Sequence, residues 1–176
     1  LLEWDIEGDP FCRSGESGMD NSPRFDAATA MDATDFNSFL ALECEILAEM
    51  SSALGRSAEA MHWQSEYERV CSLIRDRLWS ERHQFFVDYD VEKNAASDVL
   101  ASSGFLPLIC GAATPAQAAA LVAALKDPEM FGTAFPVPSI AFKDRSHYVK
   151  DMWRGPVWIN LNWLIASGLD RYGYSK

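Results

Sequence analysis

The spacing of apolar residues predicts two consecutive helices in the first half of the chain. From about Thr34 to Gly55, apolar residues recur at three- and four-residue steps and so share one helix face. They are Phe36, Phe39, Leu40, Ile46, Leu47, Met50 and Leu54. Ser57 is the expected N-cap of a second helix. Its apolar stripe consists of Trp63, Tyr67, Val70, Ile74 and Leu78. Gly55 tolerates the left-handed conformation that ends a helix, and the short link around it predicts an antiparallel helical hairpin.

Shorter elements follow in the next part of the chain. Residues 84–90 contain a short aromatic run that predicts either one strand or a loop. Residues 96–110 are apolar but interrupted by Gly and Pro, which predicts a short or kinked helix. Thr114 begins a capping box that Gln117 completes, so a helix is expected from there to about residues 126–128.

The last predicted helix opens at Pro156 and stops near Gly173. Before it, residues 131–139 form a stiff connector, and the first thirty residues read as an irregular loop rich in Gly and Pro. No alternating pattern of strands and helices competes with the helical hairpins. The sequence therefore predicts an all-α architecture.

Composition narrows the functional classes. The chain has 176 residues, 48% of them hydrophobic and 23% charged, which is typical of one globular domain. Its formal net charge of −11 and the lack of a Lys/Arg cluster argue against a nucleic-acid partner. No apolar run reaches the roughly 18 to 20 residues that span a bilayer, so no membrane partner is expected.

The cysteines show no metal-ligand spacing. All four lie far apart, without a C-x-x-C pair, so we expect free, mostly buried thiols and no metal ion. They are Cys12, Cys44, Cys71 and Cys110. Disulfides remain the alternative, although a chain of this size does not need them.

Two loops carry most of the unusual residues. Residues 16–26 place charged groups among small turn residues, and residues 151–160 set two tryptophans around an arginine at a helix start. Carboxylates next to aromatic rings suit sugar chemistry, because a carboxylic acid protonates the leaving oxygen while apolar sugar faces lie on Trp. The alternative is structural: the aspartates cap turns and pair with the arginines, and both tryptophans fill the core. The residues concerned are Asp26, Asp32, Arg24, Arg154, Trp153 and Trp158.

The first of these loops resembles the signature loop of a known enzyme family. Residues 16–26, Glu-Ser-Gly-Met-Asp-Asn-Ser-Pro-Arg-Phe-Asp, are similar to that of the mannosyl-oligosaccharide glucosidases (glycoside hydrolase family sixty-three) and of mannosylglycerate hydrolases. The trehalases, with a related loop, are a more distant resemblance. Residues 153–160, followed by residues 169–174, resemble a second signature of the group, and residues 135–139 fit between them. The resemblance implies that residues 1–176 are a fragment of one catalytic domain, a partial (α/α) toroid of six helical hairpins around a central pocket.

The resemblance also implies an inverting α-glycosidase that acts on short α-glucosides or α-mannosides. The Asp of the first loop, here Asp20, is the general acid of the family, and it needs a dry pocket to stay protonated near neutral pH. The general-base Glu of the family lies in a loop beyond the last helix, and no residue of this sequence matches it. We therefore expect this chain to be inactive by itself.

Further expectations follow from the same resemblance. The partners would be an oligosaccharide or small glycoside and the missing segments of the same domain, and acid/base hydrolysis requires no cofactor. A partial ring leaves apolar helix faces uncovered, so the isolated chain is expected to aggregate or to need those segments. The alternative is a non-catalytic carbohydrate-binding or scaffold fragment of the toroid.

Six further residues are candidates for substrate binding. They are Trp153, Trp158, Glu16, Arg24, Arg154 and Asn160. The two tryptophans match family positions that contact the sugar, but Met152 stands where related hydrolases carry Tyr, so one polar contact is absent. Glu16 and Arg24 orient the acid or bind hydroxyls, unless a buried ion pair holds the loop. Asn160 reaches a ligand or bonds a neighbouring carbonyl, and Asp151 is interpreted as structural.

Overall fold

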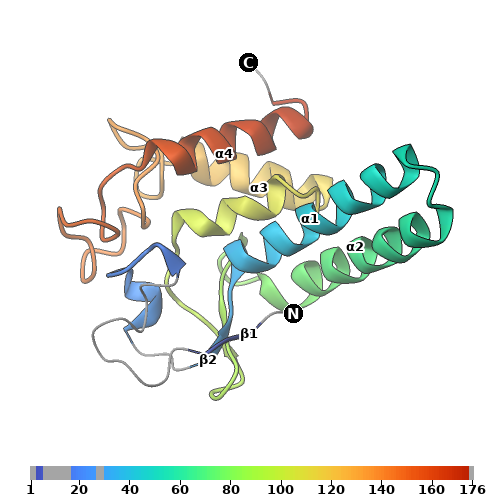
Figure 1. Cartoon of the computed structure of the whole chain (residues 1–176). Helices are drawn as coiled ribbons and strands as arrows, with labels where there is room; N and C mark the ends of the chain where they lie inside the picture. The colour runs from blue at the N-terminus through green and yellow to red at the C-terminus, as the bar shows by residue number, and fades with distance from the viewer. Residues whose placement is uncertain (1–2, 6–16, 27–29, 175–176) are drawn as a thin grey trace.

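The structure, a computed structural model, describes residues 3–5, 17–26 and 30–174 and is mainly helical (Figure 1). The longer helices are α1 (Thr34–Ala53), α2 (Ser57–Leu78), α3 (Pro115–Lys126) and α4 (Ile159–Arg171). The 3₁₀ segments η2 (Pro23–Phe25) and η3 (Ser102–Leu108) lie outside them. Within the described ranges, no helix is long and apolar enough to cross a membrane.

Helices α1 and α2 form the predicted hairpin. Gly55 takes a left-handed φ of +71° just after α1, a conformation that residues with a Cβ rarely adopt. Ser57 was predicted to be the N-cap of α2, but it is the first residue of the helix. The cap is Arg56, because its carbonyl already accepts a hydrogen bond from the N–H of Ala60 at 3.0 Å.

Helix α1 packs through small side chains rather than through its large apolar residues. Ala41, Cys44 and Ala48 are buried, which lets α2 and η3 approach α1 closely. The large members of its predicted stripe that remain exposed are Phe36, Phe39, Ile46, Met50 and Leu54. The described part of the chain therefore leaves an apolar face of α1 uncovered, as expected of a partial ring.

The capping box predicted for α3 is present. The N–H of Gln117 donates to Thr114 Oγ1 at 3.2 Å, and the N–H of Thr114 donates to Gln117 Oε1 at 2.8 Å. The short or kinked helix predicted within residues 96–110 is η3, which contains Pro107.

Helix α4 begins later than predicted. It starts at Ile159 rather than at Pro156, because the chain before it is extended: Val157 pairs with Pro138 in an antiparallel bridge. Its C-terminus agrees with the prediction, since α4 ends just before Gly173, which has a left-handed φ of +77°.

Short antiparallel strands complete the fold. Strands β1 (Glu3–Asp5), β2 (Ala30–Asp32), β5 (Tyr89–Asp90) and β6 (Ala95–Ala96) pair in that order. A second pair consists of β3 (Trp79–Ser80) and β4 (Phe85–Phe86). The aromatic run at residues 84–90 therefore contributes two short strands rather than one. Pairs this short leave no alternating pattern of several residues, which is why the sequence did not reveal the sheets.

Three phenylalanines form the centre of the core. The rings of Phe85, Phe105 and Phe131 lie 4.9 to 5.3 Å apart, one pair stacked and two pairs edge to face. The prediction of free, buried thiols is confirmed for three cysteines, Cys44, Cys71 and Cys110. Cys12 lies outside the described residues.

The two loops that the sequence singled out lie at the same end of the molecule. Residues 17–26, blue in Figure 1, lie beside the orange loop that precedes α4. Hydrogen bonds between the side chain of Asn21 and residues 151–153 join them. This end of the molecule therefore contains the candidate site.

Candidate functional site

Asp20 lies in a tight turn. The backbone N–H of Ser22 donates to the carbonyl of Met19 at 2.8 Å, which closes the turn around Asp20 and Asn21. Met19 and Ser22 are buried, whereas Asp20 is exposed. Gly18, with a left-handed φ of +69°, leads the chain into this turn. The turn thus holds the predicted acid at the surface between two buried anchors. We call residues 17–22 the acid turn.

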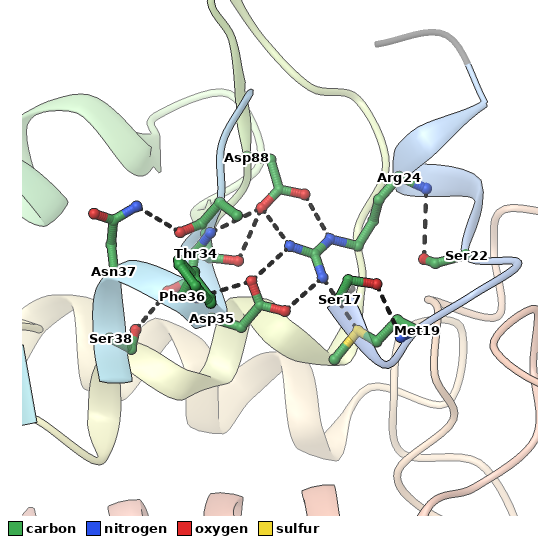
Figure 2. A network of polar contacts seen from close by, with 11 residues as sticks. Ser17, Met19, Ser22, Arg24, Thr34, Asp35, Phe36, Asn37, Ser38 and Asp88 are labelled. Carbon is green, nitrogen blue, oxygen red and sulfur yellow. Dashed lines mark hydrogen bonds and ion pairs between the residues drawn. The ribbon is translucent and has the colours of Figure 1, made fainter. Parts of the chain in front are cut away.

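The buried side chain of Arg24 fixes the acid turn (Figure 2). Its guanidinium donates through Nε and Nη2 to Asp88 at 2.6 and 2.8 Å, and through Nη1 and Nη2 to Asp35 at 2.8 and 2.9 Å. The remaining Nη1 hydrogen is directed at the sulfur of Met19, 3.1 Å away. All five N–H groups are therefore occupied, and the side chain of Arg24 is 0% exposed.

The two carboxylates also bind the first turn of α1. The N–H and the hydroxyl of Thr34 donate to Asp88 Oδ1 at 2.9 and 3.0 Å, and the N–H of Phe36 donates to Asp35 Oδ1 at 2.9 Å. A helix N-terminus favours negative charge, since its N–H groups lack intrahelical partners. Arg24 thus links the acid turn to α1 and, through Asp88, to the segment between β4 and β5.

Charge within this network outweighs the effect of burial on two pKa values. Burial alone would lower the pKa of Arg24, but the carboxylates of Asp35 and Asp88 hold it well above its ordinary value. Burial alone would raise the pKa of Asp35, but the charge and hydrogen bonds of Arg24 lower it. The pair of Arg24 and Asp35 is therefore ionised at neutral pH.

The sequence left open whether Arg24 orients the acid, binds sugar hydroxyls or forms a buried ion pair, and the structure disfavours the contact with hydroxyls. The guanidinium has no N–H left to donate and no surface in contact with solvent. The alternative, a buried ion pair that holds the loop, is what the structure contains. Its acidic partners are Asp35 and Asp88, which the sequence did not single out, and Glu16 lies outside the described residues.

In the second loop, the rings of Trp153 and Trp158 stack on one another. Their centroids lie 4.0 Å apart with 3° between the planes, and Trp158 Nε1 donates to the carbonyl of Met152 at 2.9 Å. Trp153 is 4% exposed and belongs to the core, whereas Trp158 is only half-buried. With so little exposed surface, Trp153 is a poorer candidate for contact with a sugar than its partner. Trp158 is the ring of the pair that keeps exposed surface.

The backbone of this loop is tightly constrained. Gly155 has a φ of +141°, and a Cβ at this position would lie 2.7 Å from the carbonyl oxygen of Val149. Its N–H donates to Ser139 Oγ at 2.8 Å. Met152 has a left-handed φ of +39°, which is uncommon for a residue other than glycine. The stacked tryptophans therefore sit on a loop that tolerates little change in its backbone.

Two hydrogen bonds of Asn21 and one ion pair of Asp26 join residues 17–26 to residues 151–158, which we call the tryptophan loop. The N–H of Trp153 donates to Asn21 Oδ1 at 2.9 Å, and Asn21 Nδ2 donates to Asp151 Oδ2 at 2.8 Å. Arg154 forms an ion pair with Asp26, which is the pairing expected if these residues have a structural role. The predicted acid directly precedes the residue that bonds the tryptophan loop.

The remaining predicted site residues occupy separate positions. Asn160 is exposed in the first turn of α4. Arg154 is half-buried, with a carboxylate already bound, so the structure favours its structural role. Sequence reasoning missed Asn21. It belongs to the quoted motif, but nothing local indicates that its partners lie about 130 positions further along the chain.

A cavity lies on the other part of the tryptophan loop. It has a volume of about 810 Å³, and residues 155–157 form one of its walls together with the rings of Phe135, Phe142 and Tyr148. Asp20 and the two stacked tryptophans do not line it. In the part of the chain that the structure describes, no three His, Cys, Asp or Glu side chains gather into a potential metal site.

Comparison with known proteins places these loops in a family. The family model of the mannosylglycerate hydrolase MGH1-like glycoside hydrolase domain matches residues 9–176. A mannosylglycerate hydrolase of Rubrobacter radiotolerans is 32% identical over 142 residues, which cover 79% of this chain and 32% of that enzyme. The crystal structure of a GH63 mannosylglycerate hydrolase from Thermus thermophilus, in complex with Tris, matches with a TM-score of 0.73 at 25% identity, covering 83% of this chain and 34% of the other.

The fold is shared more widely. A neutral trehalase from Saccharomyces cerevisiae matches with a TM-score of 0.79 at 23% identity, covering 93% of this chain and 32% of that one. These matches confirm the predicted fold class, part of a helical (α/α) toroid, and the chain spans about a third of the length of these relatives. Because the family model covers nearly the whole chain, the chain belongs to the mannosylglycerate hydrolase MGH1-like family of glycoside hydrolases.

Proposed function

We propose that this chain, residues 1–176, supplies the acid-bearing part of an inverting α-glycosidase domain that hydrolyses short α-glucosides or α-mannosides. Membership of a glycoside hydrolase family supports the reaction class, and relatives named as mannosylglycerate hydrolases and trehalases support the substrate class. The observation that carries the proposal is that Asn21 bonds the tryptophan loop directly beside Asp20.

In this reaction Asp20 is the general acid. Its proton passes to the glycosidic oxygen as the bond between that oxygen and the anomeric carbon breaks. A general base outside this chain takes a proton from the water that attacks the anomeric carbon on the opposite face, so the product has the inverted configuration. The two carboxyl groups of such a pair stand about 6.5 to 9.5 Å apart, which leaves room for the water.

We propose that the sugar ring lies on Trp158 and that Asn160 binds one of its hydroxyl groups. The half-buried ring of Trp158 is fixed by the stack on Trp153 and by its bond to the carbonyl of Met152. A fixed aromatic face suits an apolar sugar face, since little rotational freedom is lost on binding.

The chain by itself would not hydrolyse glycosides. Asp20 is exposed, whereas a general acid that works near neutral pH needs surroundings that exclude water and keep the carboxyl protonated. The missing segments of the toroid would supply both these surroundings and the base. This is why we infer that the acid turn is a half-site.

The test uses the complete protein as its gene encodes it, with mannosylglycerate and trehalose as substrates. Asp20→Asn should lower kcat by about 10²- to 10⁴-fold, the usual contribution of a general acid, while sugar still binds. Asp98→Asn removes a carboxylate that is 73% exposed on the segment after β6, and it should leave kcat unchanged. Proton NMR of the first-formed sugar should show the inverted anomer. An Asp20→Asn variant with the original rate would contradict the proposal.

A non-catalytic sugar-binding role is the second candidate, favoured by one observation: the stacked tryptophans are in place while Asp20 lies exposed. In that case, addition of sugar would quench Trp fluorescence of the complete protein but no product would form.

A further inference from the structure

The side chain of Asn21 makes two hydrogen bonds of opposite polarity to the tryptophan loop. Its Oδ1 accepts from the backbone N–H of Trp153 at 2.9 Å, and its Nδ2 donates to Asp151 Oδ2 at 2.8 Å. A backbone N–H only donates and a carboxylate only accepts, so these partners fix the orientation of the amide. A side chain of this length with one acceptor and one donor is therefore needed at position 21.

The backbone around Asn21 transmits this constraint to Asp20. Both residues lie inside the turn closed by the bond from Ser22 N–H to the Met19 carbonyl, and both ends of the turn are buried. A displacement of Asn21 must therefore carry the adjoining peptide, and with it the Cα of Asp20. Trp153 is equally constrained, because its ring stacks on Trp158 at 4.0 Å.

We infer that Asn21 is a positioning residue, which holds Asp20 at a set place relative to the sugar platform on Trp158. This inference rests on the proposed function, in which Asp20 protonates the glycosidic oxygen of a sugar bound on that platform. An error of about 1 Å in the place of a catalytic group costs roughly a hundredfold in rate. Loss of the amide should therefore slow only reactions in which Asp20 must protonate the leaving group, and not every reaction of the bound sugar.

A charge exchange between Asn21 and Asp151 tests the contact. Asn21→Asp keeps the acceptor for the Trp153 N–H but sets two carboxylates against each other. Asp151→Asn in the same chain restores a donor and an acceptor, with the amide and the carboxylate interchanged. The double variant should therefore recover what the single Asn21→Asp variant loses. Asn94→Asp is the matched control, since Asn94 Oδ1 only accepts a bond from Tyr89, and the variant keeps that acceptor.

Two substrates separate positioning of the acid from a general structural role. The complete protein is assayed on mannosylglycerate, whose leaving oxygen must be protonated, and on α-mannosyl fluoride, whose fluoride leaves without a proton. Asn21→Asp should lower kcat on mannosylglycerate about 10- to 100-fold and change the rate on the fluoride by less than about threefold. The double variant should return to within about fivefold of the original kcat on mannosylglycerate, and Asn94→Asp should match the original on both substrates.

Failure of this inference is distinguishable from failure of the proposed function. If Asp20→Asn slows both substrates alike or neither, Asp20 is not the acid, whatever Asn21 does. If Asp20→Asn slows mannosylglycerate alone, the inference on Asn21 is overturned by any of three results. Asn21→Asp could keep the original rates, slow both substrates equally, or stay slow when combined with Asp151→Asn. Thermal unfolding of each variant shows whether Asn21→Asp folds, and the double variant decides the question where it does not.

Discussion

Arg24→Met is the sharpest test of the buried network under the acid turn. Methionine has a similar length but no charge, so the substitution removes five N–H donors while it largely keeps the volume. It leaves Asp35 and Asp88 buried, with side chains that are 7% and 3% exposed and no cation between them. The expected loss comes from these uncompensated charges rather than from a cavity.

The size of the loss follows from the geometry. Removal of one partner from a buried ion pair typically costs about 3–5 kcal/mol of unfolding free energy, because the other charge stays without compensation. Here the removed cation serves two carboxylates at 2.6 to 2.9 Å, so Arg24→Met should lie at or above the middle of that range near pH 7. Arg82→Met is the matched control. Arg82 pairs with Asp98 at 2.9 Å, but both side chains are more than 70% exposed, and such pairs contribute less than about 1 kcal/mol.

The dependence on pH identifies charge as the cause. In the original protein the folded-state pKa of Asp35 is lowered, so its contribution is complete above the unfolded value of about 3.9 and is lost only below it. In Arg24→Met, Asp35 stays buried beside a second carboxylate without the cation that lowers its pKa, so its folded-state pKa should be raised. The variant's stability should then fall as the pH rises from about 4 to 7, and the difference from the original protein should be largest near pH 7.

The assay is urea unfolding of the complete protein at several pH values, followed by circular dichroism. Arg24→Met combined with Asp35→Asn and Asp88→Asn should recover much of the loss, since no buried charge remains. Two results would refute the reasoning: a cost no larger than that of Arg82→Met, or a cost that does not change between pH 4 and 7.

Three further outcomes are expected. Gly155→Ala should lower the melting temperature more than Gly18→Ala, because a Cβ at Gly155 would lie 2.7 Å from the Val149 carbonyl while the space around Gly18 is open. Equal shifts of the melting temperature for the two variants would show that the loop adjusts to the added Cβ. Trp158→Ala should weaken sugar binding at least tenfold by titration calorimetry, and unchanged affinity would exclude it as the platform. The isolated 176-residue chain should elute as aggregates in size-exclusion chromatography, because large apolar residues are exposed on α1 and α4; a clean monomer with a reversible melt would contradict this.

The helices were predictable because their signals are local. The capping box of Thr114 and Gln117 and the left-handed Gly55 each act within one turn of the chain, and both appear as predicted. The start of α4 could not be predicted, because the extended segment before it depends on pairing between Val157 and Pro138, which are 19 positions apart in the sequence. Local signals fix where a helix is favoured, but distant strand contacts decide where it begins.

The candidate site divides in the same way. The two loops were recognisable from residue types, and the comparisons confirm the family. The roles of Arg24 and Trp153 were not predictable, since a charged or aromatic side chain in a loop can either bind a ligand or be buried in the core. For Arg24 the outcome depended on Asp35 and Asp88, which contact it from α1 and from the segment between β4 and β5. No periodicity of the sequence marks such partners, because each lies on an element with its own pattern.

The two attachments of the acid turn differ in kind, and that difference separates their effects. Arg24 is fully buried and bound by charge, so its loss should appear mainly as lost stability. Asn21 is only half-buried and bound by two hydrogen bonds, one to a backbone N–H, worth about 1 kcal/mol, and one to an exposed carboxylate. Its loss should therefore leave the fold in place and move only the exposed part of the turn. If both served stability alone, Asn21→Asp would behave as a weaker Arg24→Met, and both would slow a glycoside and a glycosyl fluoride by the same factor. If Asn21→Asp slows only the glycoside, then Asn21 sets the position of Asp20 for proton transfer, whereas Arg24 keeps the loop folded.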